Sequence, residues 1–142
     1  MSERNVELHR RIYRALSTAD VDALVALCDP NIEIRSVFAE VGGAVYHAHE
    51  GVRGWQRDLE ESFGGEFRVE PGAYFDLGER TLVFGVLRGR GGQSGVEVAM
   101  EAYGVATWRN SLCVSHKAYQ RKEDALSDVG VSEDELGEPI AP

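Results

Sequence analysis

Residues 12–38 read IYRALSTADVDALVALCDPNIEIRSVF, and residues 49–59 read HEGVRGWQRDL. In the first stretch a helix ends at a polar break, and a second short helix begins after Asp20, a residue type preferred as a helix N-cap. A strand then leaves from Asp29-Pro30, and in the second stretch a third helix starts after Gly51. Helices followed by strands predict a fold of the α+β class.

The spacing of apolar residues sets the helix boundaries. Val6, Ile12 and Leu16 recur at roughly helical spacing and predict an amphipathic helix over residues 3–17. The second helix starts after Asp20 and ends at Asp29-Pro30-Asn31, because proline disfavours helix at the residue before it. The third helix covers Gly51–Phe63 and stops at Gly64-Gly65.

The rest of the chain alternates in the manner of strands. Residues 32–38 predict a half-buried strand with its even positions inward, followed by a turn at Gly42-Gly43 and a short return strand over Ala44–His47. Four further strands are predicted, separated by turn residues, and even positions are again expected to point inward in the second and third of them. These four strands are Phe67–Leu77, Thr81–Arg88, Gly95–Trp108 and Leu112–Tyr119. A last short helix is expected over Gln120–Val129.

The length of 142 residues fits one domain, which we expect to cover residues 1–130. From Glu123 onward the chain contains seven acidic residues and no basic one. Residues 131–142 are therefore predicted to form a mobile acidic tail.

The charge excludes several classes of partner. The formal net charge is −9 and the pI about 4.9, which argues against nucleic acid and against anionic membrane surfaces. The first residues, MSERNVELHRR, are charged and lack the apolar core of a signal peptide, so we expect a cytoplasmic protein. Cys28 and Cys113 have no CxxC partner and are interpreted as small buried hydrophobic residues.

Four segments resemble the SnoaL-like branch of the nuclear transport factor 2-like superfamily, which includes relatives of polyketide cyclases. They are DVDALVALCDPNIEI at 20–34, HEGVRGW at 49–55, SGVE at 94–97 and VSHKAYQRKEDALSDVGV at 114–131. The resemblance covers roughly residues 5–130. It implies a cone-shaped α+β fold in which a curved mixed sheet and three N-terminal helices enclose a pocket.

The catalytic groups known in that superfamily do not carry over to this chain. Where the steroid isomerase relatives place an Asp base, this sequence has Ser36, and their second acid falls at Gly104 or Tyr103. Their helix-1 tyrosine falls near Ile12, with Tyr13 on another face. The inward acid of the cyclases and the Asp-Arg-Asp set of limonene-epoxide hydrolases have no inward counterpart. The resemblance therefore implies a pocket without naming a reaction.

The predicted pocket is largely apolar, and His116 is its candidate catalytic residue. His116 is either a general base or hydrogen-bond donor to a ligand, or a histidine with a structural partner. Trp55 is either an aromatic platform for a ligand or ordinary core, and Ser36 either binds a ligand or fills space. The expected lining consists of Ile34, Ser36, Phe38, Val52, Trp55, Leu59, Met100, Gly104, His116 and Ala118.

No metal site and no cofactor are predicted, because His47 and His49 lack a third ligand. Apolar residues at outward positions, including Val83, Leu87 and Val105, predict a homodimer that covers the second face of the sheet. Two functions remain open. One is a small-molecule-binding protein, with or without a minor enzymatic activity on a cyclic or hydrophobic metabolite. The other is a non-catalytic dimerisation or accessory module whose cavity is filled by side chains such as Phe84, Met100 and Trp108.

Overall fold

A computed structural model describes residues 3–39, 45–64, 66–91 and 95–142 of the chain. The first helix, α1, covers Glu3–Ser17, as predicted. The second, α2, covers Val21–Ala26 and is capped by Asp20, whose Oδ1 accepts a hydrogen bond of 3.1 Å from the Ala23 amide. The predicted N-cap is thus confirmed.

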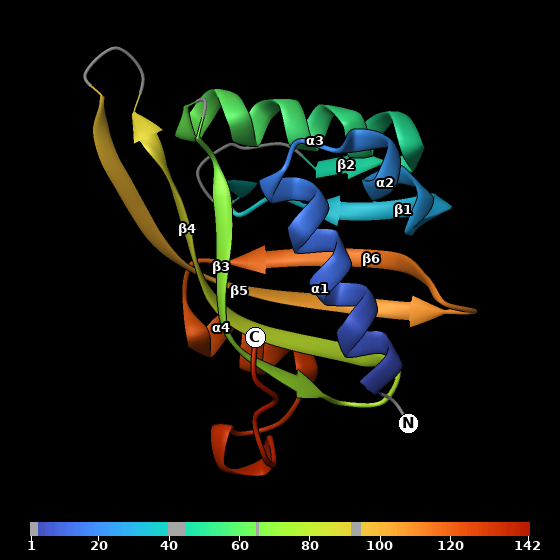
Figure 1. Cartoon of the computed structure of the whole chain (residues 1–142). Helices are drawn as coiled ribbons and strands as arrows, with labels where there is room; N and C mark the ends of the chain where they lie inside the picture. Colours follow the sequence, from blue (N-terminus) through green and yellow to red (C-terminus); the bar gives the residue numbers. More distant parts are fainter. Residues whose placement is uncertain (1–2, 40–44, 65, 92–94) are drawn as a thin grey trace.

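The described strands form one six-stranded sheet in the order β2-β1-β6-β5-β4-β3 (Figure 1). Only the β1–β6 pair is parallel, so the sheet is mixed. The strands are β1 Cys28–Arg35, β2 Val45–His47, β3 Arg68–Asp76, β4 Arg80–Gly91, β5 Val96–Arg109 and β6 Leu112–Tyr119. Gly42-Gly43 and residues 92–94 of the predicted turns lie outside the described residues.

The predicted end of the second helix and the predicted bounds of the first strand, residues 32–38, are wrong by two to four residues. Helix α2 ends at Ala26 rather than at Asp29-Pro30-Asn31, and β1 already contains Pro30. The ladder between β1 and β6 shifts register between Cys28 and Glu33, and such irregular positions tolerate a residue without an amide hydrogen.

Helix α3 covers Ala48–Phe63 and begins three residues before the predicted Gly51. A Cβ at Gly51 would lie 3.0 Å from the Cβ of Tyr46, so the glycine inside the first turn allows β2 to pack closely. At its end Gly64 has φ +80°, and a Cβ there would lie 1.6 Å from the Arg90 carbonyl oxygen. Gly64 therefore ends the helix as predicted.

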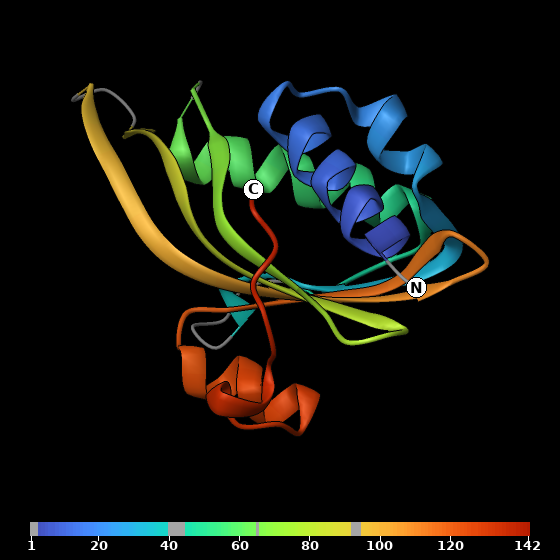
Figure 2. The same cartoon turned by 60° about the horizontal axis from the view of Figure 1, so that its bottom comes forward.

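Helices α1, α2 and α3 cover the concave face of the curved sheet (Figure 2). The described residues contain a fourth α-helix, α4 at Lys122–Val129, which packs on the opposite face and adds to the three helices of the predicted cone. Two guanidinium hydrogen bonds of 3.0 and 3.1 Å from Arg80 reach the carbonyls of Asp128 and Val129 at its C-terminus. The Tyr119 hydroxyl donates to Asp128 at 2.7 Å, so α4 is fixed to the sheet by polar contacts as well.

The predicted inward side of β4 is wrong. Val83 pairs directly with Gly104 of β5, and opposite residues of an antiparallel pair lie on the same face. The odd positions Val83 and Leu87 therefore face the helices, whereas Leu82 and Phe84 face α4. The alternation of either strand alone does not determine this register, because a shift by one residue exchanges the two faces of a strand.

The outer face of the sheet is partly covered by its own chain. A second apolar cluster there consists of Phe75, Leu82, Tyr103, Val105, Ala125, Val129 and Leu136. Leu136 belongs to the predicted tail, and Ile140 pairs with Tyr74 of β3 through backbone hydrogen bonds of 2.7 and 2.9 Å. Residues 131–142 thus make specific contacts, and their mobility in solution stays a prediction.

Candidate functional site

A small cavity lies between the helices and the concave face of the sheet. Its volume, taken as the space open to the centre of a water molecule, is about 30 Å³. By that measure one water needs about 10–15 Å³, so the cavity has room for two or three atoms. It is lined by Tyr13, Leu16, Val37, Trp55, Leu59, Phe67, Val69, Val83, Gly85, Val86, Leu87, Ala102, Gly104, His116 and Ala118.

Tyr13 and His116 supply the polar side chains of this lining. The Tyr13 hydroxyl lies 3.1 Å from His116 Nε2, and both side chains are buried. If the Tyr13 hydroxyl donates to Nε2, only the Nδ1–H of His116 is left without a described partner. If Nε2–H donates to the hydroxyl oxygen instead, both His116 Nδ1 and the Tyr13 hydroxyl hydrogen are left without one. The geometry therefore favours His116 as a neutral ring carrying its hydrogen on Nδ1.

Burial keeps the imidazole neutral. It lowers the pKa of His116 to about 4, because the charged form loses its hydration. The ring is therefore neutral at pH 7. Burial likewise raises the pKa of Tyr13 well above its ordinary value. Tyr13 and His116 are thus both uncharged and can form hydrogen bonds with a neutral group.

A second buried polar group lies next to this pair. The Trp108 indole donates to Thr81 Oγ1 at 2.9 Å, and Thr81 Oγ1 lies 2.8 Å from His9 Nδ1. The Thr81 oxygen can accept from both the indole and His9 Nδ1–H, but the Thr81 hydrogen would then have no partner. Donation from Thr81 to His9 Nδ1 uses that hydrogen and is therefore favoured, and His9 Nε2 has no described partner in either case. Burial first, and then the nearby His116, lower the pKa of His9. The two histidine rings lie 5.5 Å apart.

Five of the ten predicted pocket residues line the cavity. These are Trp55, Leu59, Gly104, His116 and Ala118. Ile34 and Val52 are core residues, Phe38 packs 5.9 Å from Phe63 between ring centroids, and Met100 packs partly exposed against the core. The Ser36 hydroxyl accepts from the Phe38 amide at 3.1 Å in a turn after β1, which is a local structural role.

Among the ten lining residues that the predicted pocket did not include, Tyr13 is the one with a polar side chain. Its position in α1 was assigned to another face than the pocket, yet its hydroxyl reaches the sheet. Gly104 provides the space: a Cβ there would lie 2.2 Å from that hydroxyl oxygen. A glycine in the middle of a long strand was the signal, because it often marks a close approach of another group.

The residues expected not to bind metal have other contacts. His49 Nε2 donates to the Cys28 carbonyl at 2.9 Å, and His47 lies 3.9 Å from Glu33 at the surface. Among residues 3–39, 45–64, 66–91 and 95–142, no three His, Cys, Asp or Glu side chains lie close enough together to hold a metal ion. No described helix is long and apolar enough to cross a membrane.

The sequence profile of the SnoaL-like domain matches residues 9–116. The chain belongs to this family. The match begins at His9 and ends at His116, so it includes both buried histidines and every residue of the cavity lining except Ala118. A comparison with curated proteins finds no match.

Solved structures show how widely this SnoaL-like fold recurs. A nuclear transport factor 2-like protein of unknown function from Burkholderia pseudomallei K96243 is 22% identical with TM-score 0.72, covering 89% of this chain and 97% of that one. A ketosteroid isomerase-like protein from Catenulispora acidiphila DSM 44928, in complex with trimethylamine, is 16% identical with TM-score 0.72, covering 90% and 95%. TerC, co-crystallised with polyporic acid, is 18% identical with TM-score 0.71, covering 85% and 94%. At these identities the likeness shows the fold alone.

Proposed function

We propose that this SnoaL-like protein binds a small, largely apolar molecule through its inner cavity, with the Tyr13–His116 pair holding a polar group of the molecule. The observation that carries the proposal is the buried His116 Nδ1, which has no described partner and belongs to a ring that lines the cavity. Buried polar atoms are rarely left unpaired, so such an atom beside an open space fits a ligand or a water. The structural relatives with trimethylamine and polyporic acid support a small-molecule role.

Binding is better supported than catalysis. The cavity lining contains no Asp or Glu, and the pKa of His116 is lowered by burial, which makes the ring a weak base. A hydrogen bond from Nδ1 to a carbonyl or hydroxyl oxygen requires no change of charge. An enzymatic activity on a cyclic or hydrophobic metabolite stays an open prediction.

The alternative is an accessory module with a filled cavity. Its supporting observation is the cavity volume of about 30 Å³, far below the roughly 300–1,000 Å³ of typical ligand sites. Phe84, Met100 and Trp108, which were expected to fill the cavity, are not part of its lining, whereas Tyr13, Trp55 and Leu87 are. A molecule of two or three non-hydrogen atoms fits without rearrangement, whereas a larger one, from 2-butanone to a cyclic metabolite, requires the helices to move away from the sheet.

The homodimer and the cytoplasmic location also stay predictions. Part of the argument for a dimer is gone, since Tyr103 and Val105 are covered by α4 and Leu136 of the same chain. Exposed Val96 and Val98 on β5 still favour a second subunit. A monomer in sedimentation at micromolar concentration would contradict the dimer.

Titration with 2-butanone tests the proposed function. A ligand of five non-hydrogen atoms binds weakly, with a ceiling of about 1.5 kcal/mol per atom, so NMR at millimolar concentration is the suitable measurement. We expect shifts of the His116 ring and Trp55 indole signals, and loss of binding in His116→Leu. His47→Leu, a change at the surface, is the control. Unchanged signals in the wild-type protein would contradict the proposal and favour the filled module.

A further inference from the structure

A second hollow lies at the surface between α1 and β3. Its volume by the same measure is about 190 Å³, and its lining includes Arg10, Tyr13, Arg14, Ser17, Val69 and Tyr74. Tyr13 and Val69 line the inner cavity as well. These two side chains are thus the wall that the surface groove and the inner cavity share, and a shift of the Tyr13 ring would join the two spaces.

The groove is electropositive on a protein of net charge −9. The guanidinium of Arg14 has no ion pair or hydrogen bond with any described residue, although its backbone carbonyl accepts from Thr18. Arg10 contacts Glu7 at 3.4 Å and the Ala141 carbonyl at 2.6 Å, and its guanidinium carbon lies 5.3 Å from the centre of the Tyr74 ring. Arg14 therefore leaves an unbalanced positive charge at the groove.

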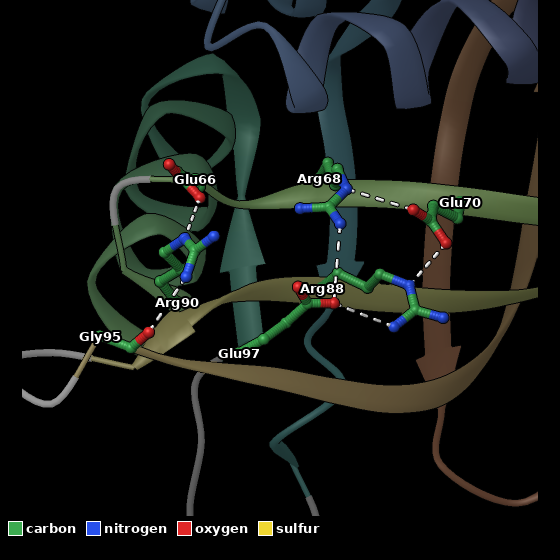
Figure 3. Close-up of polar contacts among 7 residues, drawn as sticks. All are labelled: Glu66, Arg68, Glu70, Arg88, Arg90, Gly95 and Glu97. Carbon is green, nitrogen blue, oxygen red and sulfur yellow. Dashed lines mark hydrogen bonds and ion pairs between the residues drawn. The ribbon is translucent and has the colours of Figure 1, made fainter.

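The arginines of β3 and β4 differ from Arg14 in this respect. Figure 3 shows that Arg68 and Arg88 form ion pairs with Glu70 and Glu97. It also shows the ion pair between Arg90 and Glu66. Each of these guanidinium groups contacts a carboxylate at 2.6–3.3 Å. That network is balanced, whereas at the groove Glu7 pairs with Arg10 and no described carboxylate lies within ion-pair distance of Arg14.

Tyr74 adds a hydrogen-bond donor to the groove. Its side chain is fully buried, and its hydroxyl has no described hydrogen-bond partner. A neutral phenol can donate to an anion, and hydrogen bonds to charged acceptors are roughly twice as strong as neutral ones. A buried unpaired donor and an unpaired guanidinium line the same groove.

We propose that the groove between α1 and β3 binds the carboxylate of a small organic acid, through Arg14, Arg10 and the Tyr74 hydroxyl, while the apolar part of the acid enters the cavity past Tyr13. This deepens the proposed function and rests on it: the ligand of the inner cavity is an anion rather than a neutral molecule. The apolar lining then holds the hydrocarbon part, and the Tyr13–His116 pair sits midway along the molecule.

A matched pair of ligands tests the charge requirement. Propanoate and propanamide have nearly the same shape, carry an apolar part small enough for the inner cavity, and differ in charge at pH 7. We expect the carboxylate to bind about tenfold more tightly, as a charge-assisted hydrogen bond predicts. Arg14→Gln should remove this preference. Arg11→Gln should keep it, because Arg11 contacts Glu7 on the same helix and does not line the groove.

NMR signals of the Trp55 indole and the His116 ring separate the possible failures. Equal affinities for the acid and the amide, with both signals shifted and Arg14→Gln without effect, would overturn the anion site and leave the proposed function intact. Tight binding of the carboxylate that moves neither signal would overturn the connection to the cavity. Absence of binding by both compounds would overturn this inference, whereas the 2-butanone titration judges the proposed function separately.

Discussion

The Tyr13–His116 contact exists because residue 104 has no side chain. A Cβ at Gly104 would lie 2.2 Å from the Tyr13 hydroxyl oxygen and 3.3 Å from His116 Nε2. We predict that Gly104→Ala displaces the Tyr13 ring and lowers the free energy of unfolding by about 1–3 kcal/mol, as overpacking of a core does. Urea denaturation measures this loss.

Gly54→Ala is the matched control for that change. Gly54 is buried in α3, and a Cβ there would meet its nearest neighbours at 3.4–3.5 Å, which is ordinary contact. Alanine is favoured over glycine inside a helix by about 1 kcal/mol, so stability should stay equal or rise. Equal losses in both variants would mean that the Gly104 site has no special geometry.

His116 gives a pH dependence whose direction follows from its burial. Its pKa is about 4 in the folded protein and near 6.5 in the unfolded chain, so only the unfolded chain takes up the proton between these values. Stability from this group is complete above pH 6.5 and declines as the pH falls to 4, by about 3 kcal/mol in all.

The measurement is the free energy of unfolding in urea at several pH values, for the wild-type protein and His116→Leu. The variant should show a flatter decline between pH 6.5 and 4, with a remaining slope from His9, whose pKa is also lowered by burial. It should also lose about 1–3 kcal/mol at pH 7, because the Tyr13 hydroxyl is left without its partner. If the wild-type protein and His116→Leu lost stability equally as the pH falls, folding would not lower the pKa of His116.

At the scale of single residues the sequence predicts those features that depend on near neighbours. Asp20 was recognisable as a cap because its partner is three residues away. His116 was recognisable as inward from the alternation of its own strand. Its partner Tyr13 was not, because residues 103 positions apart meet only through the tertiary fold.

Helix α3 carries Trp55 into the cavity, where the indole lies 5.1 Å from the His116 ring between centroids. We predict that an apolar ligand changes the fluorescence of Trp55, since it replaces water or empty space against the ring. The measurement uses a Trp108→Phe background, in which Trp55 is the remaining tryptophan. A bound ligand that leaves this emission unchanged would place it elsewhere.

Among the elements, helices were predicted more closely than the facing of strands. Helix α1 shows its apolar stripe in one continuous segment, so its bounds follow from the residues themselves. Strand β4 is apolar on both sides, and a one-residue change of register exchanges its two faces. The alternation of β4 therefore cannot decide between Val83 and Phe84 as the inward residue, and the pairing with β5 does.

For the whole molecule, the sequence predicted one face of the sheet and not the other. The family resemblance implies helices on the concave side, and the structure has them there. The outer face was assigned to a second subunit, but α4 and Leu136 occupy part of it. The acidic composition of residues 131–142 does not predict where Leu136 and Ile140 pack.

The contacts of residues 138–142 lead to a last prediction, which concerns the edge of the sheet and the groove together. Ile140 pairs with Tyr74 on the outer edge of β3, and the Ala141 carbonyl holds Arg10. Removal of residues 138–142 should leave α4 and Leu136 in place, expose the Tyr74 amide, and release the Arg10 guanidinium.

We expect this truncation to give faster hydrogen exchange at Tyr74 and a loss of about 1–2 kcal/mol in stability, from two backbone hydrogen bonds. A full-length variant with Ile140→Pro, which removes one donor, should show part of the same effect. Unchanged exchange at Tyr74 in both proteins would mean that the segment is detached in solution, as its acidic composition first suggested.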